Sequence, residues 1–195
     1  MVCGVEKAHF EIVNTDNLGL ADLFSVNPTS CENVDFYVQY LSEYALYDFQ
    51  TGRAVTHMFI DDVANRIMGF VSLRSSSVLS SDDKGRMLGS PAIEIAVLAV
   101  DQQYERRGVG TNLIDYVLII AERMQENYLG VRHIVLAADA IAVGFYEKMG
   151  FGYMEDRWEL MPKEQWSVNC VPMSMHLDFE KKYITPYPDD LDDEW

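Results

Sequence analysis

The spacing of apolar and polar residues predicts a chain in which strands and helices are interspersed. Residues 7–14 alternate apolar and polar side chains, as a half-buried strand does. Residues 92–100 and 131–138 are almost continuously apolar, which is typical of central strands covered on both faces. Four more strands are predicted, two in a hairpin and two near the end of the chain: 54–61, 66–73, 151–160 and 170–179.

Helical spacing predicts three helices between these strands. Residues 35–48 carry an aromatic stripe that is expected to pack in the core, formed by Phe36, Tyr40, Tyr44 and Tyr47. Residues 113–124 repeat apolar side chains at helical spacing, and residues 140–150 predict a short helix that Gly150 ends. The serine-rich residues 74–91 have no clear period and predict a long connection. Together the elements predict one mixed α/β domain.

Net charge narrows the possible partners. The formal net charge is −16 at pH 7, and the last ten residues carry five carboxylates and no cation. A field of this sign repels phosphate backbones and attracts cations, so a nucleic-acid partner is not expected.

We expect residues 1–180 to form one domain and residues 181–195 to form a flexible acidic tail.

Composition favours a globular protein of the cytoplasm, and it leaves a monomer and a homodimer both open. Hydrophobic residues make up 49% of the chain and charged residues 24%. No apolar run reaches the roughly 18–20 residues of a membrane span, and no secretory signal is expected. Three widely spaced cysteines without a CxxC pair argue against a disulfide framework and against a metal site.

One basic, glycine-rich stretch lies between the apolar strand 92–100 and the helix that follows it. It reads YERRGVGTNL over residues 104–113. Gly108 and Gly110 let the backbone approach a ligand closely, and backbone N–H groups at a helix N-terminus attract anions. Arg106 and Arg107 can add charge-assisted hydrogen bonds to phosphate. The stretch therefore predicts a phosphate-binding turn, with a tight turn and solvated arginines as the alternative.

Two common nucleotide-binding patterns do not fit this turn. A P-loop requires a lysine directly after its second glycine, where this chain has Thr111. The dinucleotide pattern G-x-G-x-x-G requires a third glycine, where this chain has Leu113. A hydrolysing nucleotide loop is therefore not expected.

The turn and a second motif together resemble the GNAT superfamily of acetyl-CoA-dependent N-acyltransferases, over about residues 92–154. In that family a strand enters a Q/R-x-x-G-x-G/A turn around the coenzyme A pyrophosphate, as in the segment EIAVLAVDQQYERRGVGTNLIDYVL. A later strand and helix end in Y-x-K-x-G-F, as in IVLAADAIAVGFYEKMGFGYM. Glu105 stands at the first position of the turn motif, where glutamine or arginine is usual.

The resemblance implies an α/β (α+β) domain whose mixed, mostly antiparallel sheet has a V-shaped splay between two central strands and helices on its flanks. It implies acetyl-CoA as co-substrate and no metal. Asp139 stands where many members carry asparagine. The residues that the resemblance places at the coenzyme come from the strand, the turn and the second motif: Leu98, Ala99, Val100, Arg106, Arg107, Gly108, Val109, Gly110, Thr111, Asp139 and Tyr146.

Amine acetylation needs one proton to be removed and another to be supplied. An amine of pKa about 10.4 is neutral in only on the order of one molecule in a thousand at pH 7, and the departing thiolate benefits from a proton donor. The resemblance places Tyr146 near the coenzyme sulfur as that donor, although a core aromatic also suits its helix face. Glu94, the only ionisable side chain in residues 92–100, is the candidate base, because burial raises a carboxyl pKa. A structural carboxylate paired with a cation is the alternative.

The sequence leaves the acceptor open. The acidic field favours the primary amine of a small cationic or peptide acceptor. The serine-rich connection and the FYEKMGF segment resemble a toxin-type branch that acetylates charged tRNA, a function that calls for a basic surface. A non-catalytic module that binds coenzyme A is a third possibility. In the superfamily the early helices wall the acceptor pocket, which makes the tyrosines of residues 35–48 candidates to meet the acceptor.

Overall fold

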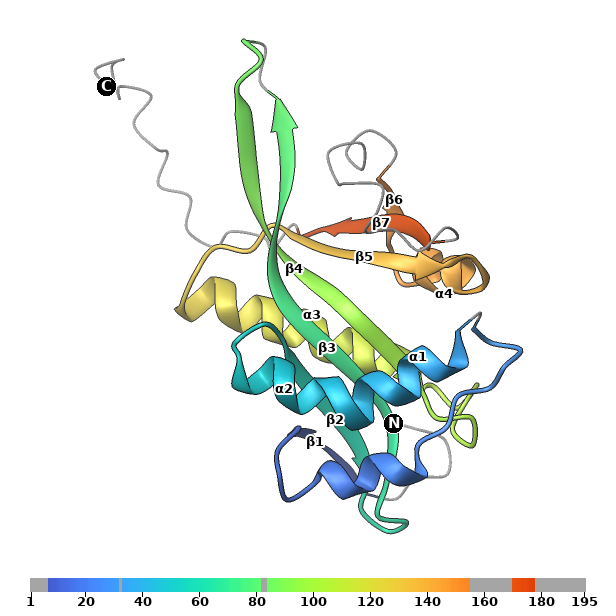
Figure 1. Ribbon diagram of the computed structural model, residues 1–195. Coiled ribbons are helices and arrows are strands. Elements are labelled where there is room, and N and C mark those ends of the chain that lie inside the picture. The colour runs from blue at the N-terminus through green and yellow to red at the C-terminus, as the bar shows by residue number, and fades with distance from the viewer. Residues whose placement is uncertain (1–6, 32, 82–83, 155–169, 178–195) are drawn as a thin grey trace.

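The computed structural model describes residues 7–31, 33–81, 84–154 and 170–177 (Figure 1). Its sheet has seven strands in the order β1-β2-β3-β4-β5-β7-β6, and within the described residues β4 and β5 form the one parallel pair. The elements in chain order are β1 (Ala8–Ile12), η1 (Leu18–Leu23), α1 (Val34–Gln39), η2 (Tyr40–Tyr44), α2 (Ala45–Gln50), β2 (Val55–Asp61), β3 (Arg66–Ser81), β4 (Met87–Val100), α3 (Val109–Asn127), β5 (His133–Asp139), η3 (Ala140–Ala142), α4 (Val143–Lys148), β6 (Gly152–Tyr153) and β7 (Cys170–His176).

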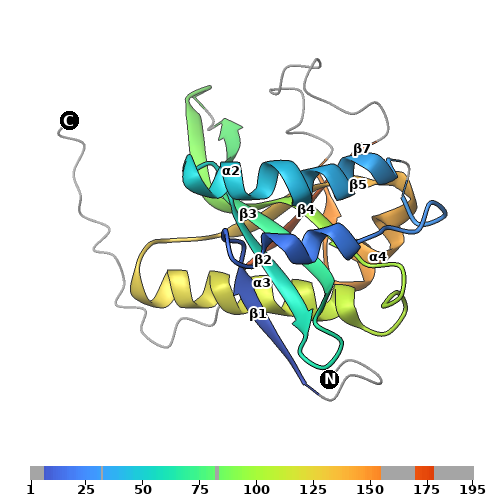
Figure 2. The same cartoon turned by 60° about the horizontal axis from the view of Figure 1, so that its bottom comes forward.

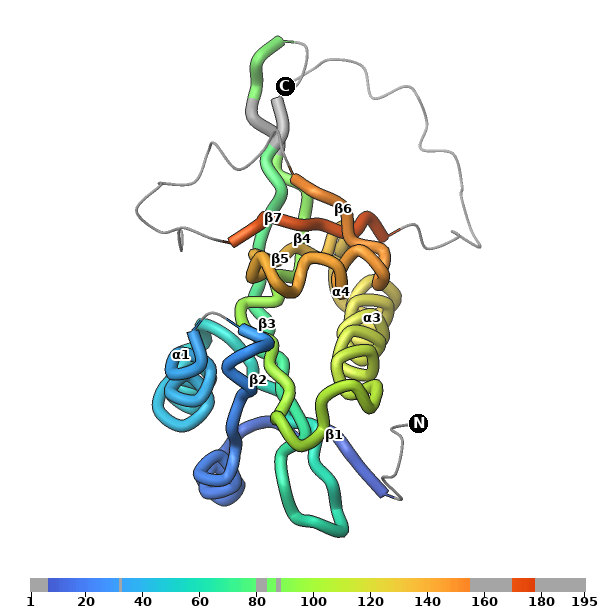
Figure 3. The backbone as a smooth tube through the Cα atoms, turned by 90° about the vertical axis from the view of Figure 1, so that its right-hand side faces the viewer, coloured from blue at the N-terminus to red at the C-terminus, as the bar shows by residue number. Residues whose placement is uncertain are grey.

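Helices cover both faces of the sheet. Figures 2 and 3 show α1 and α2 on one side of the central strands and α3 on the other. The buried residues form two large clusters that match these layers: one joins α3 to the sheet through residues such as Leu113 and Ile134, and the other lies under α1, with Leu41 and Phe70. None of the described helices is long and apolar enough to cross a membrane.

A bulge in β4 lets this one strand contribute to both cores. Leu73 pairs with Ile95 but Ser72 pairs with Val97, which leaves Ala96 as the extra residue. Ile95 belongs to the cluster under α3, whereas Val97 belongs to the cluster under α1. Residues two apart in a regular strand share a face, so the extra residue is what reverses the orientation of the strand beyond it.

The two central strands part halfway along their length. Parallel pairing joins residues 92–95 of β4 to residues 133–136 of β5. Beyond that point β4 continues to Val100 and β5 to Asp139 without pairing to each other. The V-shaped splay between two central strands is therefore present, in a single mixed domain with a mostly antiparallel sheet as expected.

The serine-rich residues 74–91 are not the loop that the sequence predicted. They extend the hairpin, because β3 and β4 stay paired out to Ser81 and Met87. This part projects from the body of the protein (Figure 1). Serine gives such a ribbon little of the apolar alternation by which a half-buried strand is recognised, which explains why its period was not visible.

The aromatic stripe of the first helix is also different from the prediction. The helix runs from Val34 to Gln50, but η2 in its middle is a π-helical segment, which adds a residue to the turn and rotates the later residues. Tyr40 is buried, as predicted, and Leu41 and Ala45 are buried beside it. Core packing was wrong for the other three stripe residues, which are between 45% and 49% exposed: Phe36, Tyr44 and Tyr47.

Some predictions fall partly or wholly outside the described residues. The strand predicted at 151–160 is present as β6 at Gly152–Tyr153, and residues 155–160 lie outside the described part of the chain. The predicted acidic tail, residues 181–195, also lies outside the described part of the chain. The strand predicted at 170–179 is β7.

Gly69 allows α3 to pack closely on β3, and we expect Gly69→Ala to destabilise the fold. An added methyl group would lie 2.9 Å from the carbonyl oxygen of Ala99 and 3.0 Å from Cγ1 of Val109, so strand or helix would have to shift. The free energy of unfolding should fall by about 1–3 kcal/mol, measured by urea denaturation. Gly89→Ala, in the same strand pair but with neighbours only at 3.9 Å, is the control. Equal stability of the two variants would contradict this packing.

Candidate active site

The glycine turn opens the N-terminus of α3. Arg106 and Gly108 have positive φ angles of 58° and 86°, which reverse the chain just before the helix. The first helical hydrogen bond runs from the N–H of Asn112 to the carbonyl of Gly108, at 3.0 Å. The N–H groups of Val109, Gly110 and Thr111 precede it and have no acceptor within the helix, and Gly108 supplies no capping side chain. This is the backbone arrangement that binds an anion.

Buried polar residues hold the turn in place. Asp101, directly after β4, is fully buried, and its carboxylate accepts hydrogen bonds from the backbone N–H groups of Ser25 and Gln103. The hydroxyl of Tyr104 donates to Asp61 at 3.0 Å. Sequence reasoning did not single out Asp101 or Tyr104. Two features of the sequence could have pointed to them: Asp101 is a polar residue directly after an apolar strand, and Tyr104 is an aromatic residue within a polar turn.

The two arginines of the turn differ. Arg106 is exposed, whereas the guanidinium of Arg107 stacks on the ring of Tyr104 at 5.0 Å from its centroid. Glu105 accepts a hydrogen bond from the side chain of Asn27 at 3.0 Å. Both arginines therefore stand beside the open helix N-terminus, and the atypical Glu105 is engaged with another loop.

Gly110 brings three elements together at the start of α3. A methyl group at this position would lie 3.2 Å from Cζ of Phe145 in α4 and 3.8 Å from Cγ2 of Val100 at the end of β4. Without a side chain, Gly110 lets the helix N-terminus approach both. The predicted phosphate turn is thereby adjacent to the splay and to the helix that carries Tyr146.

The splay leaves part of the β4 backbone without a partner strand. The N–H of Asp101 donates to the carbonyl of Met68, at 2.9 Å, so residue 101 faces β3. The backbone N–H and C=O groups of successive strand residues point to alternate sides, so those of Ala99 also point toward β3 and form hydrogen bonds within the sheet. Leu98 and Val100 face the opposite side, from which β5 has departed. Two of the three strand residues predicted at the coenzyme thus have backbone groups without a partner strand in the described part of the chain.

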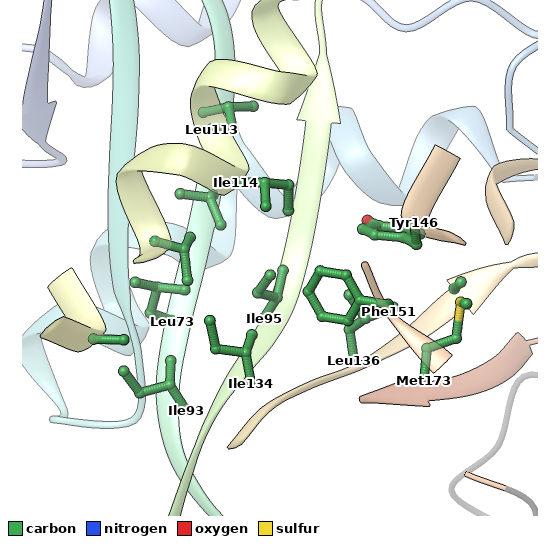
Figure 4. Packing of buried hydrophobic residues seen from close by; sticks show 14 of the residues in the cluster. Leu73, Ile93, Ile95, Leu113, Ile114, Ile134, Leu136, Tyr146, Phe151 and Met173 are labelled. Atoms are coloured by element: carbon green, nitrogen blue, oxygen red, sulfur yellow. The ribbon is translucent and has the colours of Figure 1, made fainter. Parts of the chain in front are cut away.

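Tyr146 lies beside this opening, and its hydroxyl has no hydrogen-bond partner among the described residues. Its ring is 7% exposed and packs edge to face with Phe145 and Phe151, and Figure 4 shows it next to Phe151 and close to β4. Burial raises the pKa of the Tyr146 hydroxyl above its ordinary value, and the charge of Asp139 adds to the rise. Within the described residues the hydroxyl makes no hydrogen bond. By contrast, four other tyrosines use theirs: Tyr37, Tyr40, Tyr104 and Tyr116.

Asp139 ends β5 on the far side of the splay. One of its carboxylate oxygens accepts a hydrogen bond from the hydroxyl of Tyr37 in α1, at 2.8 Å. The other accepts a weak one from the thiol of Cys170, at 3.9 Å. Tyr37 was among the tyrosines near the aromatic stripe, but no sequence signal linked it to Asp139, 102 residues away.

Glu94 is not in the apolar surroundings that the sequence predicted. It lies where β4 is still paired with β5, opposite Val135, and its side chain is 24% exposed. Its carboxylate forms an ion pair with Arg74 on β3. The hydrogen bond that Arg74 donates to Glu94 raises the pKa of the Arg74 guanidinium. The arrangement matches the alternative given for Glu94 in the sequence analysis, a structural carboxylate paired with a cation.

Among the described residues, no group of three or more histidine, cysteine, aspartate or glutamate side chains is placed to hold a metal ion.

The splayed sheet and the open helix N-terminus are the arrangement that the resemblance to acyltransferases predicted. The chain belongs to the acetyltransferase (GNAT) family, whose model matches residues 21–151, more than half of its length. It is thus an N-acetyltransferase with acetyl-CoA as co-substrate.

Several solved structures of similar fold are toxins. A structure described as a bacterial toxin has a TM-score of 0.65 at 16% identity, over 87% of this chain and 90% of that chain. AtaT complexed with acetyl-methionyl-tRNAfMet has a TM-score of 0.64 at 15% identity, over 85% and 94% of the two chains. A KacT mutant with one tyrosine changed to phenylalanine has a TM-score of 0.60 at 14% identity, over 86% and 94%. At these identities the likeness shows a shared fold.

Proposed function

We propose that this chain transfers the acetyl group of acetyl-CoA directly to the primary amine of a small cationic or peptide acceptor, with Tyr146 as the proton donor. The observation that carries the proposal is the unpaired hydroxyl of Tyr146 beside the splay, between the free backbone of Leu98 and Val100 and the end of β5. The net charge of −16 supports a cationic acceptor.

The residues present suit acetyl-CoA as substrate. The N–H groups of Val109, Gly110 and Thr111 would bind the pyrophosphate, with Arg106 and Arg107 adding positive charge. The unpaired N–H of Leu98 or Val100 would donate to the thioester carbonyl and stabilise its developing negative charge. The backbone of Ala99 faces β3, so a contact there would come from its side chain.

The reaction needs no acyl-enzyme. The acceptor nitrogen forms a bond to the thioester carbonyl carbon, and the carbon–sulfur bond breaks. The departing thiolate takes the proton of the Tyr146 hydroxyl, and the nitrogen loses a proton to a base or to water. The phenolate of Tyr146 then regains a proton from solvent, which restores the enzyme. Because burial raises the pKa of this phenol, it stays protonated, and so able to donate, throughout the neutral range.

Screening acceptors tests the proposal. Purified protein and acetyl-CoA are incubated with polyamines, amino acids, aminoglycosides and lysine peptides, and released thiol is measured. Turnover with a cationic amine supports the proposal. Coenzyme A binding without turnover of any acceptor, and without any effect of Tyr146→Phe, would instead indicate a non-catalytic module.

A second acceptor, aminoacyl-tRNA, is favoured by one observation. The solved structures of similar fold include AtaT complexed with acetyl-methionyl-tRNAfMet. Acetyl-methionyl-tRNA carries the acetyl group on the α-amine of methionine, and acetylation of such an amine is a chemistry that the same site would perform. Growth arrest on expression, together with acetylation of charged tRNA in vitro, would support this acceptor. Acetylation of free amines without growth arrest would contradict it.

Glu94 as the base stays a prediction. Glu94→Gln is expected to lower kcat/KM about 10- to 100-fold at pH 7, with a smaller loss as pH rises, because more of the acceptor amine is then neutral. Rates across pH 7–10 measure this. Arg74→Gln is the control, since it breaks the same ion pair but keeps the carboxylate. An equal loss in both variants, flat across pH, would show that the ion pair matters rather than a base.

A further inference from the structure

Asp139 is a half-buried carboxylate that pairs with no cation in the described part of the chain. Its two hydrogen-bond donors, the Tyr37 hydroxyl and the Cys170 thiol, are both neutral, and within the described residues it forms no ion pair. Two other carboxylates have a cation nearby: Glu94 on β4 is paired with Arg74, and Asp101, directly after β4, lies 3.8 Å from Arg66. Asp61 on β2 has no printed ion pair either, but it accepts three hydrogen bonds, from Tyr104 and from two backbone N–H groups. A half-buried carboxylate without a counter-charge is costly, which favours the arrival of a cation from outside the chain.

The position of Asp139 places this charge at the reaction centre. It is the last residue of β5, beyond the point where β5 leaves β4, and the chain continues through η3 into α4 and Tyr146. Burial raises the pKa of both Tyr146 and Tyr37, and the charge of Asp139 adds to the rise in each. The carboxylate therefore lies within electrostatic reach of both phenols.

Tyr37 fixes the direction of this carboxylate. Its hydroxyl reaches Asp139 from α1, the helix on the opposite side of the sheet from α3. The ring of Tyr37 packs against Phe36 at 5.3 Å in an edge-to-face contact, which limits its movement. Asp139 therefore offers a charge whose direction is held by a second residue.

We propose that Asp139, held by Tyr37, binds the ammonium group of the acceptor and so selects cationic amines over neutral nucleophiles. This rests on the proposed function, because it assigns the acceptor side of the same site. It also explains product release: acetylation converts the ammonium into an uncharged amide, which the carboxylate no longer attracts. In this assignment Asp139 recognises the acceptor, and the coenzyme is held by the turn and by β4.

Replacing the charge alone tests the assignment. Asp139→Asn keeps the shape and can still accept the hydrogen bond from Tyr37. With spermidine as acceptor we expect KM to rise about 10- to 100-fold. With hydroxylamine, a nucleophile that is uncharged at pH 8, kcat/KM should change less than about twofold. The Kd of acetyl-CoA, measured by calorimetry, should stay the same.

Tyr37→Phe separates positioning from charge. It removes the hydrogen bond but keeps the carboxylate, so KM for spermidine should rise by a smaller factor, about two- to fivefold. In the Asp139→Asn background the same change should have almost no further effect on KM. Additive effects of the two substitutions would contradict the role given to Tyr37.

The other outcomes are distinguishable. Equal losses with spermidine and hydroxylamine, or a weaker Kd for acetyl-CoA, would overturn the assignment and return Asp139 to the coenzyme or to the fold. Wild-type turnover of hydroxylamine but not of spermidine would also overturn it while leaving the transferase intact. No turnover of either compound would count against the proposed function itself.

Discussion

Tyr146→Phe is expected to lower kcat by about 10²- to 10⁴-fold, the range that general acid catalysis supplies, with little change in the Kd of acetyl-CoA. The substitution removes only an oxygen, and that oxygen makes no hydrogen bond within the described residues. The ring contacts with Phe145 and Phe151 remain. A loss of rate would therefore come from the missing proton and not from altered packing. Turnover and calorimetry on the same preparation measure both quantities.

Tyr116→Phe is the matched control for this prediction. Tyr116, on α3, is also a partly buried tyrosine, but its hydroxyl forms a hydrogen bond of 3.1 Å with His57 on β2. Its loss should leave kcat unchanged. A Tyr146→Phe enzyme as fast as the wild type would eliminate the phenol as the acid.

The raised pKa of Tyr146 adds a pH dependence to the same prediction. A phenol donates only while it is protonated, and burial moves its titration above the ordinary value of about 10. The wild-type kcat should therefore show no alkaline decline from this group up to about pH 10. A decline with an apparent pKa near 8 or 9 that disappears in Tyr146→Phe would contradict the burial described here.

The parts of the fold that sequence predicted are those whose signals are local. The apolar run of β4, the two glycines of the turn and the short helix that carries Tyr146 each lie within about twenty residues, and their periods or glycines are visible directly. The family resemblance joined them into a splayed sheet. The projecting hairpin was missed because serines give no apolar alternation, and the aromatic stripe was misplaced because a π-helical turn is not visible in residue spacing.

The parts of the site that sequence could not predict depend on partners far apart in the chain. The pairing of Glu94 with Arg74 requires the register of the hairpin, which the bulge at Ala96 shifts. The hydrogen bond from Tyr37 to Asp139 requires α1 to lie over the end of β5, and no local pattern carries that information. Sequence identified Glu94, Asp139 and Tyr146 as candidates, but their charges and partners became known only from the fold.

Gly108→Asp is expected to weaken acetyl-CoA binding most among the substitutions in the turn, and Gly108→Asn separates charge from backbone strain. Gly108 has a φ of 86°, a conformation that most side chains avoid but that asparagine and aspartate both tolerate. A Cβ there would meet only the side chain of Asn112, at 3.9 Å, so either side chain has room. The two variants should unfold at similar temperatures, since their strain is alike.

The difference between these two variants measures the repulsion between a carboxylate and the coenzyme pyrophosphate. At a few ångströms from the phosphates this repulsion is on the order of 1–3 kcal/mol, so the Kd of acetyl-CoA should be about 10- to 100-fold weaker for Gly108→Asp than for Gly108→Asn. Calorimetric titration measures it, and the gap should narrow as salt is raised, because the turn is exposed and the charges are screened. Equal affinities at low salt would mean that the phosphates bind elsewhere. In that case the open N-terminus of α3 would not be the coenzyme site.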